Sequence, residues 1–153
     1  MIKVADLMTR SPHTLLRHHT LADAKNMMTA LHIRHIPIVD AHQHLLGVVT
    51  QRDLLAAQDS SLVHHSMDDS FTQNTPLYEI MHTNTITADP RAGLRQSALQ
   101  MQKHKIGCLP VVEKGRLVGI ITDSDFVAIA INLLELQEEN EPEEVDTEAG
   151  TSV

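Results

Sequence analysis

The fold is decided by Gly119-Ile120-Ile121-Thr122-Asp123-Ser124-Asp125, which has an earlier counterpart in Gly47-Val48-Val49-Thr50-Gln51-Arg52-Asp53. Each copy predicts a short apolar strand that ends at a threonine, with a helix beginning just before the final aspartate. Two interpretations of the threonine and aspartate are open at this corner. They cap the first turn of the helix, or they join its free amide groups in binding a polar ligand.

The similarity between the two copies extends over most of the chain and indicates a tandem duplication. Val4-Ala5-Asp6-Leu7-Met8-Thr9 corresponds in order and spacing to Leu77-Tyr78-Glu79-Ile80-Met81-His82. The further matches, also in order, are Thr14 with Thr87, Leu21 with Leu94, Met28 with Met101, Ile33 with Ile106 and Pro37 with Pro110. Such a repeat outranks local signals in assigning a fold, so we expect two similar units.

Each unit contains the same predicted elements. Thr20 is a good N-cap for a helix whose apolar residues Leu21, Ala24 and Met28 follow helical spacing, and Gly93 holds the same cap position in the second copy. Two apolar runs joined by a polar turn then predict a β-hairpin, and a second helix follows each aspartate. The fold class is therefore α/β, with two β-α-β-β-α units.

Composition shifts set the domain boundaries. The first unit is predicted over residues 1–58, a polar linker over 59–75, the second unit over 76–136 and a disordered acidic tail over 137–153. The last helix carries an apolar stripe, including Phe126, that exceeds what one small unit needs. We expect that stripe to pack on a second copy of the chain, forming a homodimer through helices.

Composition also limits the classes of function. The net charge of −8 arises in residues 135–153, which contain no Lys or Arg, so the rest of the chain has no basic excess for binding nucleic acid. No apolar run approaches the ~20 residues of a membrane span, and no signal peptide is visible. We therefore expect a cytoplasmic protein with an aliphatic core, and its single cysteine, Cys108, excludes an intramolecular disulfide.

The duplicated patterns h-x-D/E-h-M, h-P-h-V and G-h-h-T-x-x-D, where h is an apolar residue, resemble the cystathionine-β-synthase (CBS) domain family. The resemblance covers about residues 1–134, and the pair looks like a Bateman module in a stand-alone CBS domain-containing protein. It implies that the two units pack as a pseudo-two-fold pair. It also implies two clefts between them that bind adenine-containing molecules.

By this resemblance, each cleft combines the T-x-x-D of one copy with the first strand and pre-proline residues of the other. The aspartate would accept hydrogen bonds from ribose hydroxyls, while the threonine and helix amides would face phosphate. The expected residues of the first cleft are Thr9, His13, Thr14, Ile33, Arg34, His35, Ile120, Thr122, Ser124 and Asp125. Those of the second cleft are Val48, Thr50, Arg52, Asp53, Thr85, Ile86, Thr87, Ile106, Gly107 and Cys108.

The two clefts are not equivalent at the pre-proline position. The first has Arg34 and His35 there, whereas the second has Gly107 and Cys108. Because phosphate is bound best by cationic donors, and by the planar guanidinium in particular, we expect the Asp125 cleft to bind nucleotides more strongly. Arg52 partly compensates in the other cleft.

The resemblance predicts a regulatory or sensory module that binds AMP, ADP, ATP or S-adenosylmethionine, requires no cofactor and acts on an unidentified protein. One alternative is an interaction adaptor with vestigial clefts. Another is a metal-binding protein using some of the 11 histidines, although pairs such as His18-His19 point apart in a loop or strand, so we expect no metal site. No nucleophile or general base has an orienting partner, so we expect no catalytic residues and no enzyme activity.

Overall fold

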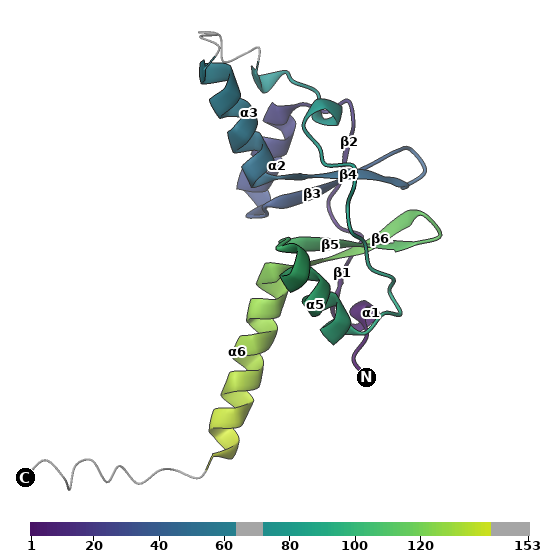
Figure 1. Ribbon diagram of the computed structural model, residues 1–153, viewed down its shortest axis with the longest axis vertical. Helices are drawn as coiled ribbons and strands as arrows, with labels where there is room; N and C mark the ends of the chain where they lie inside the picture. Colours follow the sequence, from purple (N-terminus) through teal and green to yellow (C-terminus); the bar gives the residue numbers. More distant parts are fainter. Residues whose placement is uncertain (64–71, 142–153) are drawn as a thin grey trace, which may run out of the picture. The chain divides into compact units, whose positions relative to one another are not determined.

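The computed structural model describes residues 1–63 and 72–141. Residues 64–71 of the expected linker and 142–153 of the expected tail lie outside the described part. The chain divides into two compact parts, residues 1–121 and residues 122–153, which are described separately. Helices and strands alternate around two small sheets, which confirms the α/β class (Figure 1).

The first sheet has the strand order β2-β3-β4. Strand β2 (Leu15–Leu16) runs parallel to β3 (His35–Val39), which pairs antiparallel with β4 (Leu45–Thr50) as the predicted hairpin. Helix α2 (Leu21–Leu31) connects β2 to β3, and helix α3 (Gln51–Val63) follows β4. This is the predicted β-α-β-β-α order of the first unit, although α3 continues past residue 58, where we expected the linker to begin.

The second sheet repeats this arrangement. Strand β5 (Cys108–Glu113) lies beside β6 (Arg116–Thr122), and helix α5 (Leu94–His104) precedes them. Ala88 forms a parallel bridge to Val111, in the place that β2 occupies in the first sheet. The duplication seen in the sequence is therefore also a duplication of backbone structure.

The opening segment of the first repeat pairs with the second sheet. Strand β1 (Thr9–Arg10) runs antiparallel to β6, with Thr9 opposite Ile120. Ahead of it, in helix α1 (Val4–Leu7), the Val4 amide donates to the Ala92 carbonyl at 2.8 Å. Residues before the first sheet thus belong structurally to the second.

The opening segment of the second repeat makes the reciprocal exchange. It contains the 3₁₀ helix η1 (Leu77–Glu79), and the Leu77 amide donates to the His19 carbonyl at 2.8 Å. Val48 and His82 bond each other in both directions, each amide donating to the other's carbonyl at 3.0 Å. Because each repeat completes the other's sheet, residues 1–121 form one compact unit.

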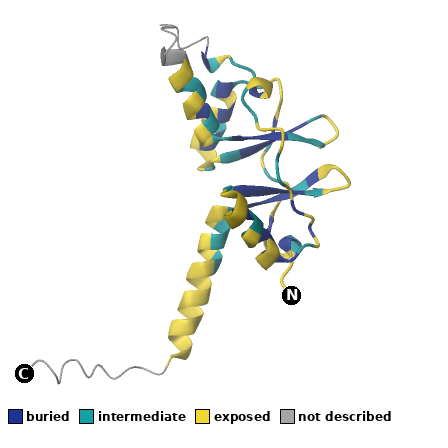
Figure 2. Ribbon diagram, viewed as in Figure 1, coloured by how far each residue is buried: buried dark blue, intermediate teal, exposed yellow. Residues whose placement is uncertain are grey.

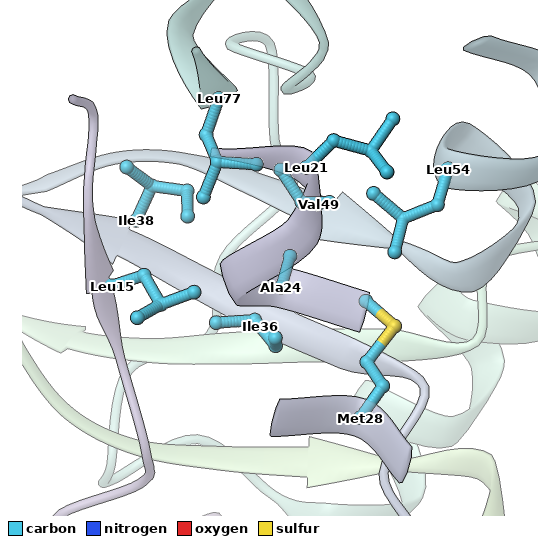
Figure 3. Close-up of a cluster of buried hydrophobic side chains, with 9 residues drawn as sticks. All are labelled: Leu15, Leu21, Ala24, Met28, Ile36, Ile38, Val49, Leu54 and Leu77. Carbon is cyan, nitrogen blue, oxygen red and sulfur yellow. The ribbon is translucent and has the colours of Figure 1, made fainter. Parts of the chain in front are cut away.

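The first sheet is covered by an aliphatic core, as the composition predicts (Figure 3). Leu77, from the second repeat, is fully buried in this cluster and lies above β3 and α2. The nine buried members of the cluster are Leu15, Leu21, Ala24, Met28, Ile36, Ile38, Val49, Leu54 and Leu77. Burial of such side chains contributes roughly 1.5–3 kcal/mol each, so the exchange is held by packing as well as by hydrogen bonds.

Helix α6 (Asp123–Asn140) forms most of the second described part and has no buried residue. It is exposed along nearly its whole length (Figure 2), including Val127, Leu133 and Leu134, whose side chains are more than half exposed. The helix also extends past Gln137, where we expected the tail to begin. Across residues 1–63 and 72–141, no helix has the length and apolar character needed to cross a membrane.

Candidate ligand-binding site

The Asp53 corner lies where β4 ends and α3 begins. Oδ2 of Asp53 accepts hydrogen bonds from the Thr50 amide at 2.8 Å and from Thr50 Oγ1 at 2.9 Å. The Asp53 amide donates back to Thr50 Oγ1 at 3.2 Å, which completes a reciprocal cap. One carboxylate oxygen is therefore committed to holding the first turn of the helix, and the interpretation as a helix cap is correct for this oxygen.

The other oxygen of Asp53 faces His82. Nε2 of His82 lies 2.5 Å from Asp53 Oδ1, and the side chains of the two residues are 66% and 11% exposed, respectively. We did not expect His82 among the site residues. The repeat could have indicated it. His82 matches Thr9 at the end of the h-x-D/E-h-M pattern, and Thr9 was one of the expected site residues.

Three predicted site residues from both repeats meet in one buried cluster. Val48, Cys108 and Ile120 pack together, although we assigned Ile120 to the first cleft and the other two to the second. Gly47 allows the backbone of His82 to approach closely, because a Cβ at Gly47 would lie 2.5 Å from the His82 carbonyl oxygen. The two sheets thus meet through the apolar residues next to the threonine-aspartate corners.

The remaining residues expected around Asp53 are less closely connected. Thr85 and Ile86 are half-buried, Thr87 and Arg52 are exposed, and Ile106 and Gly107 are half-buried at the end of α5. Among the described residues, no hydrogen bond joins any of these side chains to Asp53. Their assignment to a cleft stays a prediction.

The Asp125 corner repeats the same cap within residues 122–153. Oδ2 of Asp125 accepts from the Thr122 amide at 2.8 Å and from Thr122 Oγ1 at 3.2 Å. Ser124 is exposed, and its amide donates to Oδ1 of Asp123 at 2.8 Å. The duplicated T-x-x-D is therefore a duplicated capping box in the structure.

The first-repeat residues expected to face Asp125 lie in several environments. Thr9 is exposed opposite Ile120, while Ile33 packs on the core of the first sheet. His35 pairs with Thr50 across β3 and β4, and the Arg34 carbonyl accepts from the Gln51 amide at 2.9 Å. His13 is exposed and Thr14 half-buried in the segment between β1 and β2. The assignment of these residues to the Asp125 cleft also stays a prediction.

A separate hollow lies at the turns of the two hairpins. It is lined by His44, Glu113, Lys114, Arg116 and Val118, none of which we predicted as a site residue. His44 forms an antiparallel bridge with Arg116, so the turns of the two repeats lie against each other. Within the described residues, no three His, Cys, Asp or Glu side chains gather closely enough to hold a metal ion.

Two interlocked β-α-β-β-α repeats with matched T-x-x-D corners define a tandem α/β module. The family model of the CBS domain matches residues 4–60 and again residues 77–132. The chain therefore belongs to the CBS domain family, as the sequence resemblance predicts, and it carries the domain twice.

Similarity to known proteins extends over nearly the whole chain. A CBS domain-containing protein of Dictyostelium discoideum is 32% identical over 137 residues, which cover 88% of this chain and 94% of that protein. A crystal structure from Vibrio cholerae, described as a candidate acetoin utilization protein (AcuB), is 68% identical with a TM-score of 0.79. The match covers 93% of this chain and 99% of that one.

Two similar crystal structures contain adenosyl compounds. The CBS domain pair of protein MJ0100, in complex with 5′-methylthioadenosine and S-adenosyl-L-methionine, is 28% identical with a TM-score of 0.75, covering 86% of this chain and 98% of that one. CBSX2 in complex with AMP is 25% identical with a TM-score of 0.74, covering 87% and 98%. CBS pairs also occur within enzymes: the chain matches 22% of the inosine-5′-monophosphate dehydrogenase of Halalkalibacterium halodurans.

Proposed function

We propose that this chain is a regulatory module that binds an adenosyl compound at its threonine-aspartate corners. The observation that carries the proposal is the repetition of one carboxylate arrangement in two matching places. In each corner the threonine holds only Oδ2 of the aspartate, so the cap does not use Oδ1. A carboxylate oxygen at the start of a helix suits a ribose hydroxyl, while nearby helix amides suit an anion.

The ligands of related structures support the adenosyl class. MJ0100 binds 5′-methylthioadenosine and S-adenosyl-L-methionine, and CBSX2 binds AMP. These compounds share adenosine and differ in what is attached at the 5′ position. We therefore propose AMP, ADP, ATP and S-adenosylmethionine as the ligands to compare for this chain.

Calorimetric titration of these four compounds into the full chain tests the proposal. We expect at least one to bind, and to raise the melting temperature because a ligand that binds only the folded state stabilises it. At a ligand concentration about 100 times Kd, the stabilisation is about 2.7 kcal/mol. No heat of binding and no thermal shift with any of the four would contradict the proposal.

We propose that the Asp125 corner binds more strongly than the Asp53 corner. His82 already contacts the second oxygen of Asp53, and Arg34 and His35 are the cationic side chains expected from the sequence to serve Asp125. Asp125→Ala should therefore weaken AMP binding more than Asp53→Ala. Because both variants lose an equivalent capping carboxylate, each serves as the stability control for the other.

A ligand held by both repeats would favour one arrangement of the pair, and a partner protein would respond to that arrangement. The size of the response would equal the ligand's differential affinity for the two states. We propose this regulatory role, in the cytoplasm, rather than catalysis by the two CBS repeats themselves.

Helix α6 favours a second role in protein association. Val127, Leu133 and Leu134 expose 58%, 61% and 59% of their surface, respectively. Exposed apolar residues on a helix without buried contacts favour a partner surface, and we propose a homodimer through this helix. If adenosyl compounds leave the melting temperature unchanged while α6 binds another protein, the adaptor interpretation would replace ligand sensing.

A further inference from the structure

His82 and Asp53 form a contact between the second repeat and the first. Asp53 uses Oδ2 for Thr50, and its Oδ1 lies 2.5 Å from His82 Nε2. A carboxylate oxygen accepts hydrogen bonds, and the His82 tautomer with its hydrogen on Nε2 donates to it in this contact. Both oxygens of Asp53 therefore have partners within the chain.

The backbone holds His82 where this contact is available. Its amide and carbonyl both bond Val48, on the strand that leads into the Asp53 corner. The ring is 66% exposed, so it can rotate away from Asp53 without entering or leaving the core. The contact is consequently easy to break and easy to restore.

The first repeat has Thr9 at the position that matches His82. Thr9 is likewise backbone-paired, opposite Ile120, so the two residues have the same place in the exchanged segments. A threonine side chain is far shorter than a histidine ring. The difference between the repeats is thus one of side-chain reach on an equivalent backbone.

We propose that His82 is a built-in competitor that occupies the Asp53 oxygen which a ribose hydroxyl would use. This inference rests on the proposed function and concerns how the chain restricts one of its two corners. A ligand reaching Asp53 must displace the His82 hydrogen bond, and a net hydrogen bond of this kind contributes about 0.5–1.5 kcal/mol. His82 therefore makes the Asp53 corner the weaker one independently of the pre-proline residues.

Calorimetric titration of AMP into variants of the full chain tests this inference. The starting variant is Asp125→Ala, which leaves Asp53 as the intact corner. Adding His82→Thr, the residue that the other repeat uses, should raise AMP affinity about 2- to 13-fold, the range that such a hydrogen bond implies. Adding His82→Gln is the matched control, because its amide can still donate to Asp53 and should give a smaller gain.

The possible results separate this inference from the proposed function. If His82→Thr leaves AMP affinity unchanged or lowers it while the wild-type chain binds AMP, His82 is no competitor and the proposed function stands. If none of AMP, ADP, ATP and S-adenosylmethionine binds the wild-type chain or any variant, both are overturned. Adding Asp53→Ala to the Asp125→Ala and His82→Thr variant should remove the gain; a gain that persists would also contradict the inference. Circular dichroism and melting temperatures verify that each variant is folded.

Discussion

Thr9 lies opposite Ile120 in antiparallel register, so a residue near the start of the chain completes the second sheet. The reciprocal bridge joins Val48 to His82. Neither sheet keeps its full set of neighbours without the other repeat. We therefore expect the two repeats to unfold together rather than one after the other.

The close crossing at Gly47 predicts that this glycine is hard to replace. A Cβ at Gly47 would lie 2.5 Å from the His82 backbone oxygen, whereas one at Gly93 would lie 3.2 Å from the flexible Met1 side chain. Gly47→Ala should lower the free energy of unfolding by roughly 1–3 kcal/mol, as overpacking does. Urea denaturation measures this loss, and an equal effect of the control Gly93→Ala would contradict the prediction.

Leu77 provides a test of the exchange between repeats. Its side chain is fully buried in the core of the first sheet, although it belongs to the second repeat. Leu77→Ala should cost roughly 2–5 kcal/mol, the range for a buried leucine. Native-state hydrogen exchange should show lost protection in β3 and β4. Tyr78→Ala, at an adjacent exposed position, is the control and should leave their protection nearly unchanged.

Asp23 predicts that stability falls at acid pH. The amide of Thr20 bonds its carboxylate and lowers its pKa from the usual 3.8, as the His44 amide does for Asp40. The unfolded chain therefore takes up protons first as the pH falls. The stability that these two carboxylates contribute is present above the usual pKa of 3.8 and is lost as the pH falls through the lowered pKa of the folded chain.

Urea denaturation between about pH 5 and pH 3 measures this loss. Asp23→Asn should lower stability most at pH 5 and reduce the slope toward pH 3, because it removes one of the titrating carboxylates. Asp59→Asn, at an exposed position of α3, is the control. A slope that Asp23→Asn leaves unchanged would show that this cap does not contribute to acid sensitivity.

Helix α6 predicts concentration-dependent association. Leu133 is 61% exposed, and in a dimer through this helix it would be covered. Leu133→Asp should raise the dissociation constant of the dimer by about tenfold or more, since it places a charge in an apolar contact. Analytical ultracentrifugation compares it with Asn132→Asp, which adds the same charge at the neighbouring exposed position. A wild-type chain that is monomeric at micromolar concentration would contradict the dimer.

Much of the Asp53 corner could be predicted because its contacts are local. Thr50 and Asp53 are close in sequence, and a threonine followed by an acidic residue at this spacing caps a helix whatever surrounds it. Val48 and Cys108, which we expected in one cleft, pack in a buried apolar cluster with Ile120, and their role in ligand binding stays a prediction. His82 was missed because its contact with Asp53 joins segments that only the exchange brings together.

The duplication, the order of helices and strands and the aliphatic core could be predicted from the sequence alone. These properties follow from spacing and periodicity, which short-range sterics and burial impose on any chain, whereas the CBS family was predicted from the resemblance of the repeated motifs. The tertiary structure decided which sheet each opening segment joins and which side chain meets Asp53. Thr9 and His82 hold matching positions in the two repeats, and a position in a repeat does not specify its partner strand. Long-range packing, with Leu77 in the core of the first sheet, selects that partner.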